Sequence, residues 1–201
     1  MSLKTSYTLI APFYDAAINR ATRAARRASL AHLPEQPGQV LVNGVGTGLD
    51  LPLLPPQHHY VGLDLTAAML QRTRPRSGAA NGRLDFQPVQ GDAHALPFAD
   101  TSFDHAVLHL ILAVVPNPAD CLKEVARVVR PGGTVLVFDK FLQPGQPALL
   151  RRLLNPAIRH VATRLDVVFE EVLGHAQTLT LESNQPALAS GWFRLIRLKK
   201  I

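Results

Sequence analysis

The chain has 201 residues, of which 47% are hydrophobic and 18% charged, which suffices for the core of one large domain and excludes wholesale disorder. Lysine and arginine outnumber aspartate and glutamate by 21 to 15, and the formal charge of +6 favours an anionic partner such as phospholipid headgroups, nucleic acid or an acidic substrate. A basic surface without such a partner is the alternative. The single cysteine, Cys121, excludes an internal disulfide and a cysteine-rich metal site.

The start of the chain predicts a basic helix. Residues 13–33 are rich in alanine and arginine, and Pro34 with the Pro37-Gly38 turn ends the pattern. Its cations are Arg20, Arg23, Arg26 and Arg27. Such a helix can lie on an anionic bilayer, and a solvated helix face is the other interpretation. No stretch reaches the roughly 18 apolar residues of a membrane span, so we expect a cytoplasmic protein, soluble or peripheral on the membrane.

The centre of the chain alternates between short β-branched runs and helix-length segments. The runs predict strands over residues 39–43, 59–64, 84–89, 103–110 and 134–138. Thr66 can cap a helix that Arg74-Pro75 ends, and a second helix is expected over residues 118–130 with Cys121 on its apolar face. The turn Pro131-Gly132-Gly133 then leads into the last strand. This alternation is typical of an α/β domain with a mainly parallel sheet.

The end of the chain has a different pattern. Residues 144–176 predict helices, whereas residues 178–182 and 192–198 alternate between apolar and polar side chains. A connection over residues 184–191 would allow these two runs to pair. We therefore expect two antiparallel strands at the end of the sheet.

Three glycines follow the first predicted strand, at the spacing Gly44-x-Gly46-x-Gly48. A strand-to-helix turn of this kind brings backbone N–H groups close to a ligand, and a tight turn without a ligand is the alternative. The spacing differs from the Gly-x-Gly-x-x-Gly of dinucleotide sites, because position 49 is leucine. Pyrophosphate binding is therefore disfavoured.

Acidic residues follow the next two strands. Asp64 ends the second strand, where a carboxylate can accept hydrogen bonds from both hydroxyls of a ribose. Asp92 follows the third strand, where it can bind an adenine amino group. Ligands of open α/β sheets lie at the carboxyl ends of the strands. These loops therefore predict a site for an adenosine.

Four segments, in this order, resemble the successive motifs of class I S-adenosylmethionine-dependent methyltransferases: VLVNGVGTG, YVGLDLTAAML, VQGDAHALPFADTSFDHAV and EVARVVRPGGTVLV. The resemblance covers residues 7–138. It implies a single doubly wound, Rossmann-like α/β domain over residues 1–201, with a mainly parallel seven-stranded sheet and an antiparallel terminal strand. Residues 1–33 would form a basic helical cap over the cofactor site. Residues 7–15 and 154–169 are similar to bacterial phospholipid N-methyltransferases and, more loosely, to ubiquinone/menaquinone C-methyltransferases.

The resemblance implies that the chain binds S-adenosyl-L-methionine and releases S-adenosyl-L-homocysteine. The residues implied for the cofactor are Asn43, Gly44, Gly46, Gly48, Asp64, Leu65, Met69, Asp92, Ala93 and His109. The glycines would lie against the methionine moiety, and Leu65 and Met69 would flank the adenine. The chain departs from the family at Val42, where the family usually has glutamate or aspartate. Asn43, beside the loop, is the candidate polar substitute.

Methyl transfer mainly requires that the acceptor be aligned and water excluded, so no fixed catalytic triad is needed. Tyr14 and His109 are the candidate catalytic residues, since a base helps an acceptor that must lose a proton. His94 is a further candidate, and each histidine can equally be a core or surface residue. No metal is expected.

The expected acceptor is a lipid amine such as phosphatidylethanolamine, reached at an anionic membrane surface. The alternatives are a small soluble or quinone-type acceptor, and a protein that binds the cofactor without turnover. Nucleic acid is disfavoured, because His109-Leu110-Ile111 stands where exocyclic-amine methyltransferases carry an Asn/Asp-Pro-Pro-aromatic cluster. No obligate protein partner is evident from the sequence.

Overall fold

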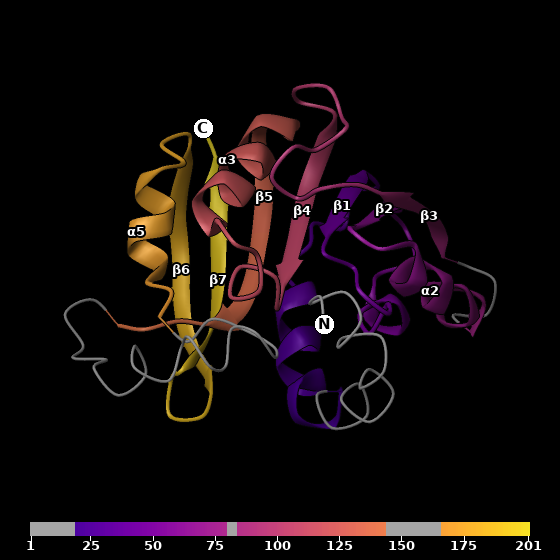
Figure 1. The fold of residues 1–201 in the computed structure, drawn as a ribbon, viewed down its shortest axis with the longest axis horizontal. Coiled ribbons are helices and arrows are strands. Elements are labelled where there is room, and N and C mark those ends of the chain that lie inside the picture. Colours follow the sequence, from indigo (N-terminus) through magenta and orange to yellow (C-terminus); the bar gives the residue numbers. More distant parts are fainter. Residues whose placement is uncertain (1–18, 80–83, 144–165) are drawn as a thin grey trace.

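The computed structural model describes residues 19–79, 84–143 and 166–201, and within them seven strands form one sheet in the order β3-β2-β1-β4-β5-β7-β6 (Figure 1). The strands are β1 (Gln39–Asn43), β2 (His59–Asp64), β3 (Asp85–Gln90), β4 (Phe103–His109), β5 (Val129–Lys140), β6 (Leu179–Leu188) and β7 (Phe193–Lys200). The helices are residues 19–30, η1 (Leu51–Leu53), α2 (Ala67–Ala79), α3 (Pro118–Val128) and α5 (Phe169–Gly174). No helix in these ranges is long and apolar enough to cross a membrane.

The directions of the strands confirm the predicted fold class. Parallel pairs join β1 to β2 and β4, β2 to β3, and β4 to β5. β7 pairs antiparallel with both β5 and β6, so it alone of the seven runs in the reverse direction. Because the chain passes from β3 at one edge to β4 beside β1, the strand order changes direction between β1 and β4. Ligands of such sheets bind at the carboxyl ends of the strands next to this point.

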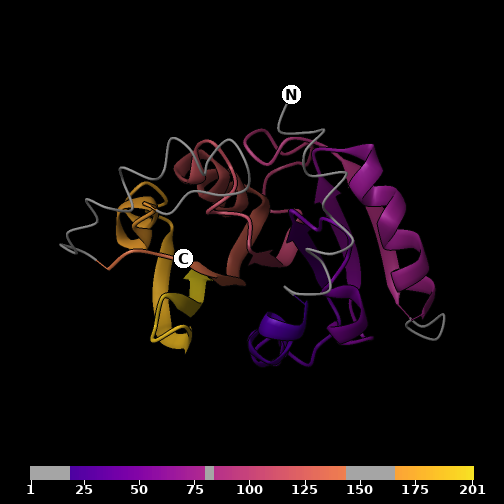
Figure 2. The ribbon, with the colours of Figure 1, turned by 60° about the horizontal axis from the view of Figure 1, so that its bottom comes forward.

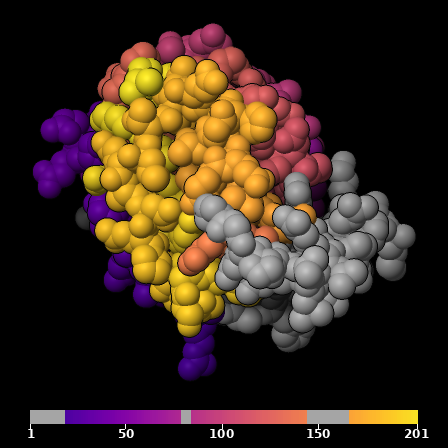
Figure 3. Space-filling view, turned by 90° about the vertical axis from the view of Figure 1, so that its left-hand side faces the viewer, coloured from indigo at the N-terminus to yellow at the C-terminus, as the bar shows by residue number. Residues whose placement is uncertain are grey.

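Side chains alternate between the two faces of the sheet and build two cores. Leu41 of β1 and Leu108 of β4 face α3 and α5 in the larger core. Val42 and Val107 face the other way and pack in a second core with Leu30 of the first helix. Figure 2 shows the helix of residues 19–30 and α3 on opposite sides of the sheet. β6 and α5 close the far end of the sheet, where Figure 3 shows them side by side at the surface.

Two predicted boundaries need correction around prolines and glycines. α2 continues through Pro75 to Ala79, although an interior proline costs about 3 kcal/mol in a helix. Arg76 holds this last part of the helix, since its guanidinium donates a hydrogen bond to the carbonyl of Thr47 at 2.6 Å. β5 begins at Val129, so α3 ends before the predicted residue 130 and the Pro-Gly-Gly segment is a bulge opposite β4, not a turn before the strand.

The carboxyl-terminal hairpin confirms the predicted antiparallel pair but is longer than expected. β6 extends through Pro186, which the sequence placed in the connection. The extension is tolerated because β6 is the edge strand, where a proline without an N–H disrupts no inner pairing. Of the predicted cap, residues 19–30 are helical, and the rest of it that precedes residue 19, with Tyr14, lies outside the described residues. Most of the predicted helical region 144–176 also lies outside the described residues. Its last part is described and contains the helix α5.

Candidate functional site

The glycine loop leaves β1 at the predicted place and requires glycine for two different reasons. Gly44, Gly46 and Gly48 have φ values of +75°, +55° and +81°, which favour glycine. A Cβ on Gly44 would overlap Ile111, and one on Gly48 would lie 2.8 Å from Leu51 Cδ1. On Gly46, however, the nearest atom of the described residues would be the Gly44 carbonyl oxygen at 4.0 Å. The space over Gly46 is therefore open to a ligand, and the loop fits a bound methyl donor.

Asp64 joins the glycine loop to the end of β2. Its Oδ2 accepts the backbone N–H of Gly46 at 3.0 Å, and its Oδ1 accepts the backbone N–H and the hydroxyl of Thr66 at 3.0 and 3.2 Å. Burial raises the pKa of Asp64, and these hydrogen bonds oppose the shift. The Thr66 hydroxyl is thus bound to Asp64, and it is the Thr66 carbonyl that accepts hydrogen bonds from the first turn of α2.

The residues predicted for the adenine lie along the same edge of the sheet. Leu65 is 51% exposed directly after β2, Met69 is partly buried in the first turn of α2, and Ala93 is buried. Asp92 Oδ1 accepts the backbone N–H of His94 at 2.9 Å and lies 2.7 Å from His94 Nδ1. These bonds lower the pKa of Asp92. His94 is therefore engaged with Asp92.

Asn43 points away from the glycine loop. It is fully buried on the α3 side of the sheet, and its Nδ2 lies 3.5 Å from Cys121 Sγ. Its Oδ1 has no hydrogen-bond partner among the described residues. Burial raises the pKa of the Cys121 thiol to about 12, which suits a core residue and not a nucleophile.

One predicted surface cation is buried. Arg26 is 1% exposed and forms an ion pair with Asp50, whose Oδ1 lies 2.8 Å from Arg26 Nη1. This corrects the expectation that Arg26 adds to a membrane-facing basic surface. Arg20, Arg23 and Arg27 are exposed. Helical spacing was the available signal, since Arg26 shares the inner side of the helix with Thr22 and Leu30.

His109 is also buried, and Asp50 is the functional candidate that sequence reasoning missed. His109 Nδ1 lies 3.1 Å from Asp50 Oδ2, and His109 Nε2 lies 3.0 Å from the Ser29 hydroxyl. His109 and Arg26 together hold the pKa of Asp50 at about 2 in spite of its burial. The structure thus links His109 to the helix and to the loop, with both ring nitrogens engaged.

Two charged residues, Asp139 and Lys140, lie at the end of β5 and are not exposed. Asp139 is buried and accepts the backbone N–H of Ala113 at 3.0 Å and that of Lys140 at 2.8 Å. Burial lowers the pKa of Lys140. Asp139 therefore fixes the loop that follows β4.

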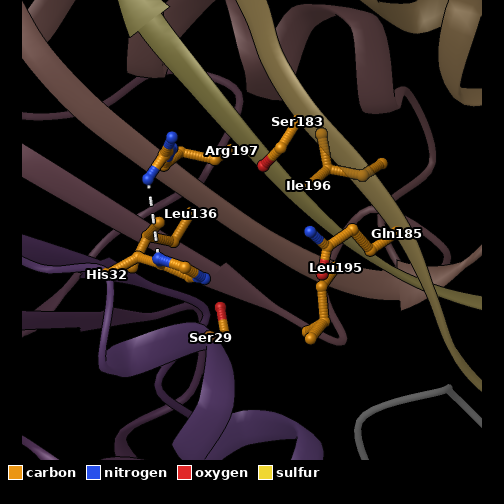
Figure 4. Close-up of a pocket in the computed structure, with 8 residues that line it drawn as sticks. All are labelled: Ser29, His32, Leu136, Ser183, Gln185, Leu195, Ile196 and Arg197. Atoms are coloured by element: carbon orange, nitrogen blue, oxygen red, sulfur yellow. Dashed lines mark hydrogen bonds between the residues drawn. The ribbon is translucent and has the colours of Figure 1, made fainter.

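Two hollows flank this framework. One, of about 300 Å³, lies beside the glycine loop and is lined by Asn19, Arg23, Leu49, Pro52, Leu53 and Arg76. The other, of about 230 Å³, lies over β5, β7 and β6, away from the loop (Figure 4). Across it, Arg197 reaches His32, with 3.5 Å between Nη1 and Nδ1. Neither hollow is lined by a residue that the sequence predicted for the cofactor.

Known proteins are similar to this chain in sequence and in fold. The family pattern described as "Methyltransferase domain" matches residues 41–137. The chain is 31% identical over 192 residues to a phosphatidylethanolamine N-methyltransferase of Cereibacter sphaeroides, covering 93% of this chain and 92% of that one. It is 30% identical over 188 residues to a demethylmenaquinone methyltransferase of Deinococcus radiodurans, covering 89% and 75%.

A solved structure supports the fold independently. A SAM-dependent methyltransferase of Thermotoga maritima superposes with a TM-score of 0.71 at 19% identity, over 98% of this chain and 99% of that one. The two relatives named above match 93% and 89% of this chain. The chain belongs to the class I S-adenosylmethionine-dependent methyltransferases.

Proposed function

We propose that this methyltransferase acts on a lipid amine such as phosphatidylethanolamine. The observation that carries the proposal is the similarity to the phosphatidylethanolamine N-methyltransferase, which extends over 93% of this chain and 92% of that relative. The exposed Arg20, Arg23 and Arg27 support it, because they form a basic stripe that suits a surface of anionic phospholipid. The enzyme would then work in the cytoplasm, peripherally on the membrane.

The cofactor site proposed for S-adenosylmethionine is the carboxyl edge of β1, β2 and β3. The backbone at Gly46 leaves room for the methionine moiety, and the Asp64 carboxylate is the acceptor for the ribose hydroxyls. Leu65 offers an exposed apolar surface to the adenine, and Asp92 an acceptor for its amino group. Asn43 is not part of this proposed site, because its side chain lies on the α3 side of the sheet, beside Cys121.

The bound cofactor supplies a methyl group on a positively charged sulfur. Held by the glycine loop, Asp64 and Asp92, the cofactor would supply this methyl group to the lone pair of an amine acceptor, the carbon–sulfur electrons would stay on sulfur, and the proton of the methylated ammonium would be lost to solvent. The chain's own residues bind and orient. Tyr14, which lies outside the described residues, remains the proposed residue for orienting the acceptor. His109 has both ring nitrogens engaged, by Asp50 and Ser29.

The test is methyl transfer from labelled S-adenosylmethionine to defined acceptors. Vesicles of phosphatidylethanolamine with an anionic phospholipid should gain label in the lipid fraction, whereas phosphatidylcholine vesicles with the same anionic lipid should not. A demethylated quinone precursor and total RNA serve as parallel acceptors. Label in the quinone and none in the lipid would overturn the lipid proposal.

A quinone-type acceptor is the second candidate. It is favoured by the similarity to the demethylmenaquinone methyltransferase, which covers 89% of this chain and 75% of that relative. An acceptor carbon must lose a proton, so this reaction depends more on a base than methylation of an amine does. Binding of S-adenosylhomocysteine without label in any acceptor would instead support a cofactor-binding protein without turnover.

A further inference from the structure

A buried polar network links the glycine loop to two other elements. At its centre is Asp50, which lies between the loop and η1 and whose backbone carbonyl accepts the N–H of Leu53 at 2.7 Å. The next residue, Leu51, donates its N–H to the Gly48 carbonyl at 3.2 Å. The turn that closes the loop is therefore held through the residues beside Asp50. Whatever fixes the Asp50 carboxylate also fixes this turn.

Arg26 fixes one oxygen of that carboxylate from the first helix. Its Nη1 donates to Asp50 Oδ1 at 2.8 Å, its Nε to the Thr22 hydroxyl at 3.1 Å, and its Nη2 to Asn19 Oδ1 at 2.5 Å. A planar guanidinium with three such partners has one orientation. Because Arg26 is 1% exposed, the ion pair lies in a region that water does not screen.

His109 fixes the other oxygen from β4. A carboxylate only accepts hydrogen bonds, so the Nδ1–H of His109 donates to Asp50 Oδ2 across 3.1 Å. In the neutral ring, Nε2 then accepts the hydroxyl of Ser29 at 3.0 Å. The ring also packs edge-on against Phe138, with 5.8 Å between the centroids. The histidine thus spans from the loop to the helix.

The Asp50 carboxylate lies on the same side of the sheet as Val42 and His109. Val42 pairs with Val107 in the sheet, and both belong to the core on the side of the first helix. His109 follows two residues after Val107 and so faces the same way. β1 itself contributes no acid to this face, and Asp50 supplies a negative charge there from the far side of the loop.

We propose that Arg26 and His109 are positioning residues for the methyl donor. They hold Asp50, and through it the closing turn of the glycine loop, against the helix of residues 19–30. The loop and the helix then form one rigid unit that is ready for the ligand. This inference rests only on the proposed cofactor site and not on the identity of the acceptor.

The test measures the affinity of the full-length protein for S-adenosylhomocysteine by calorimetry. Asp50→Asn, Arg26→Met and His109→Gln should each raise the Kd by at least about tenfold, since each removes one fixed partner of the buried carboxylate or the carboxylate itself. The double variant Arg26→Met/Asp50→Asn should be no more than about threefold weaker than Asp50→Asn, because the two residues act as one unit.

Two matched controls separate positioning from stability. His105→Gln changes another buried histidine, four residues earlier on the same strand and face. Glu170→Gln removes the partner of another buried arginine, since Arg194 Nη1 lies 2.7 Å from Glu170 Oε1 at the surface. Both controls should lower the Tm but keep the Kd within about twofold of the wild type.

The outcomes are distinct. If folded Asp50 and His109 variants bind as tightly as the wild type, or if the controls lose as much affinity, the network has no positioning role. If Asp50→Asn does not fold, the Arg26→Met/Asp50→Leu pair removes both charges together and should fold while binding at least about tenfold more weakly; binding as tight as in the wild type would overturn the inference. A wild type that does not bind S-adenosylhomocysteine overturns the proposed cofactor site itself.

Discussion

The backbone N–H of Gly46 donates to Asp64 Oδ2 at 3.0 Å, so the middle glycine of the loop is in direct contact with the acid at the end of β2. The same carboxylate is tied to Thr66 through its other oxygen. The positions proposed for the ribose and the methionine moiety are therefore set relative to each other by one side chain. A change at Asp64 should affect both.

Asp64→Ala should weaken the binding of S-adenosylhomocysteine by about 1–3 kcal/mol, roughly five- to 150-fold in Kd, because the ribose hydroxyls and the Gly46 N–H lose their acceptor. Calorimetry measures it, and NAD, which should not bind to the wild type, is the control ligand. Burial raises the pKa of Asp64 above its ordinary 3.8, so this carboxylate takes up a proton at a higher pH than an ordinary aspartate does. On acidification, the affinity for S-adenosylhomocysteine should therefore begin to fall at a correspondingly higher pH. Unchanged affinity in the variant would contradict the ribose assignment.

Val42→Glu should destabilise the protein and should not tighten cofactor binding. Val42 is 2% exposed among apolar side chains, on the face where Asp50 already holds a buried negative charge. An unpaired carboxylate there costs about 3 kcal/mol or more. Thermal melts with and without S-adenosylhomocysteine measure both effects. A glutamate variant with the wild-type Tm and tighter binding would show that the site is wet and lacks an acid.

Acid should destabilise the fold through His58 and His105, whose pKa values are lowered by burial, that of His105 from 6.5 to about 4. Below about pH 6.5 these histidines bind protons in the unfolded chain but not in the folded chain. Their contribution to the free energy of unfolding is therefore fully present above this pH and is lost as the pH falls towards about 4. For His105 the loss amounts to about 3 kcal/mol by pH 4.

The measurement is denaturant unfolding between pH 7.5 and about 4, where ΔG should fall as the linkage predicts. His105→Gln removes one proton-binding site and can still accept the Thr134 N–H, which His105 Nδ1 accepts at 3.1 Å. Its ΔG should fall less steeply with acid than that of the wild type. His59→Gln is the control, since His59 is a third exposed at its side chain. Equal slopes for all three proteins would contradict the prediction.

The sequence predicted the sheet well because its signals are local. β1 and β2 have the predicted ends, since β-branched runs and flanking turns mark a buried parallel strand. It failed where a distant residue decides the structure. Arg26 looked like a surface cation because its partner Asp50 lies 24 residues away in the chain. The extension of α2 past Pro75 likewise depends on Arg76 reaching Thr47 in the loop.

The same reasoning limits what could be predicted of the site. The glycines and Asp64 could be proposed from the sequence because they carry backbone or spacing requirements that are visible in one stretch of chain. His109 was expected in the site on family resemblance, but nothing near it in sequence indicates that Asp50 and Ser29 occupy its two nitrogens. A buried polar network assembled from three elements has no sequence pattern of its own, since each member satisfies a different local rule.

The first helix should bind anionic membranes through its exposed arginines and not through Arg26. Arg20, Arg23 and Arg27 lie within one helical stripe, and each cation near an anionic surface contributes about 1 kcal/mol. Binding to vesicles should fall steeply with salt, because screening acts over about 8 Å at physiological ionic strength. Sedimentation with phosphatidylglycerol-containing vesicles at low and high salt measures this.

Arg20→Glu/Arg27→Glu should release the protein from these vesicles while its affinity for S-adenosylhomocysteine stays unchanged. Lys123→Glu/Lys200→Glu is the matched control, because it makes the same change in net charge on α3 and β7, outside the helix. It should still bind. Arg26→Glu should instead lower the Tm, since it places a second carboxylate beside buried Asp50. If the wild type does not bind anionic vesicles at low salt, the three arginines form only a solvent-exposed helix face. That result would favour a soluble acceptor.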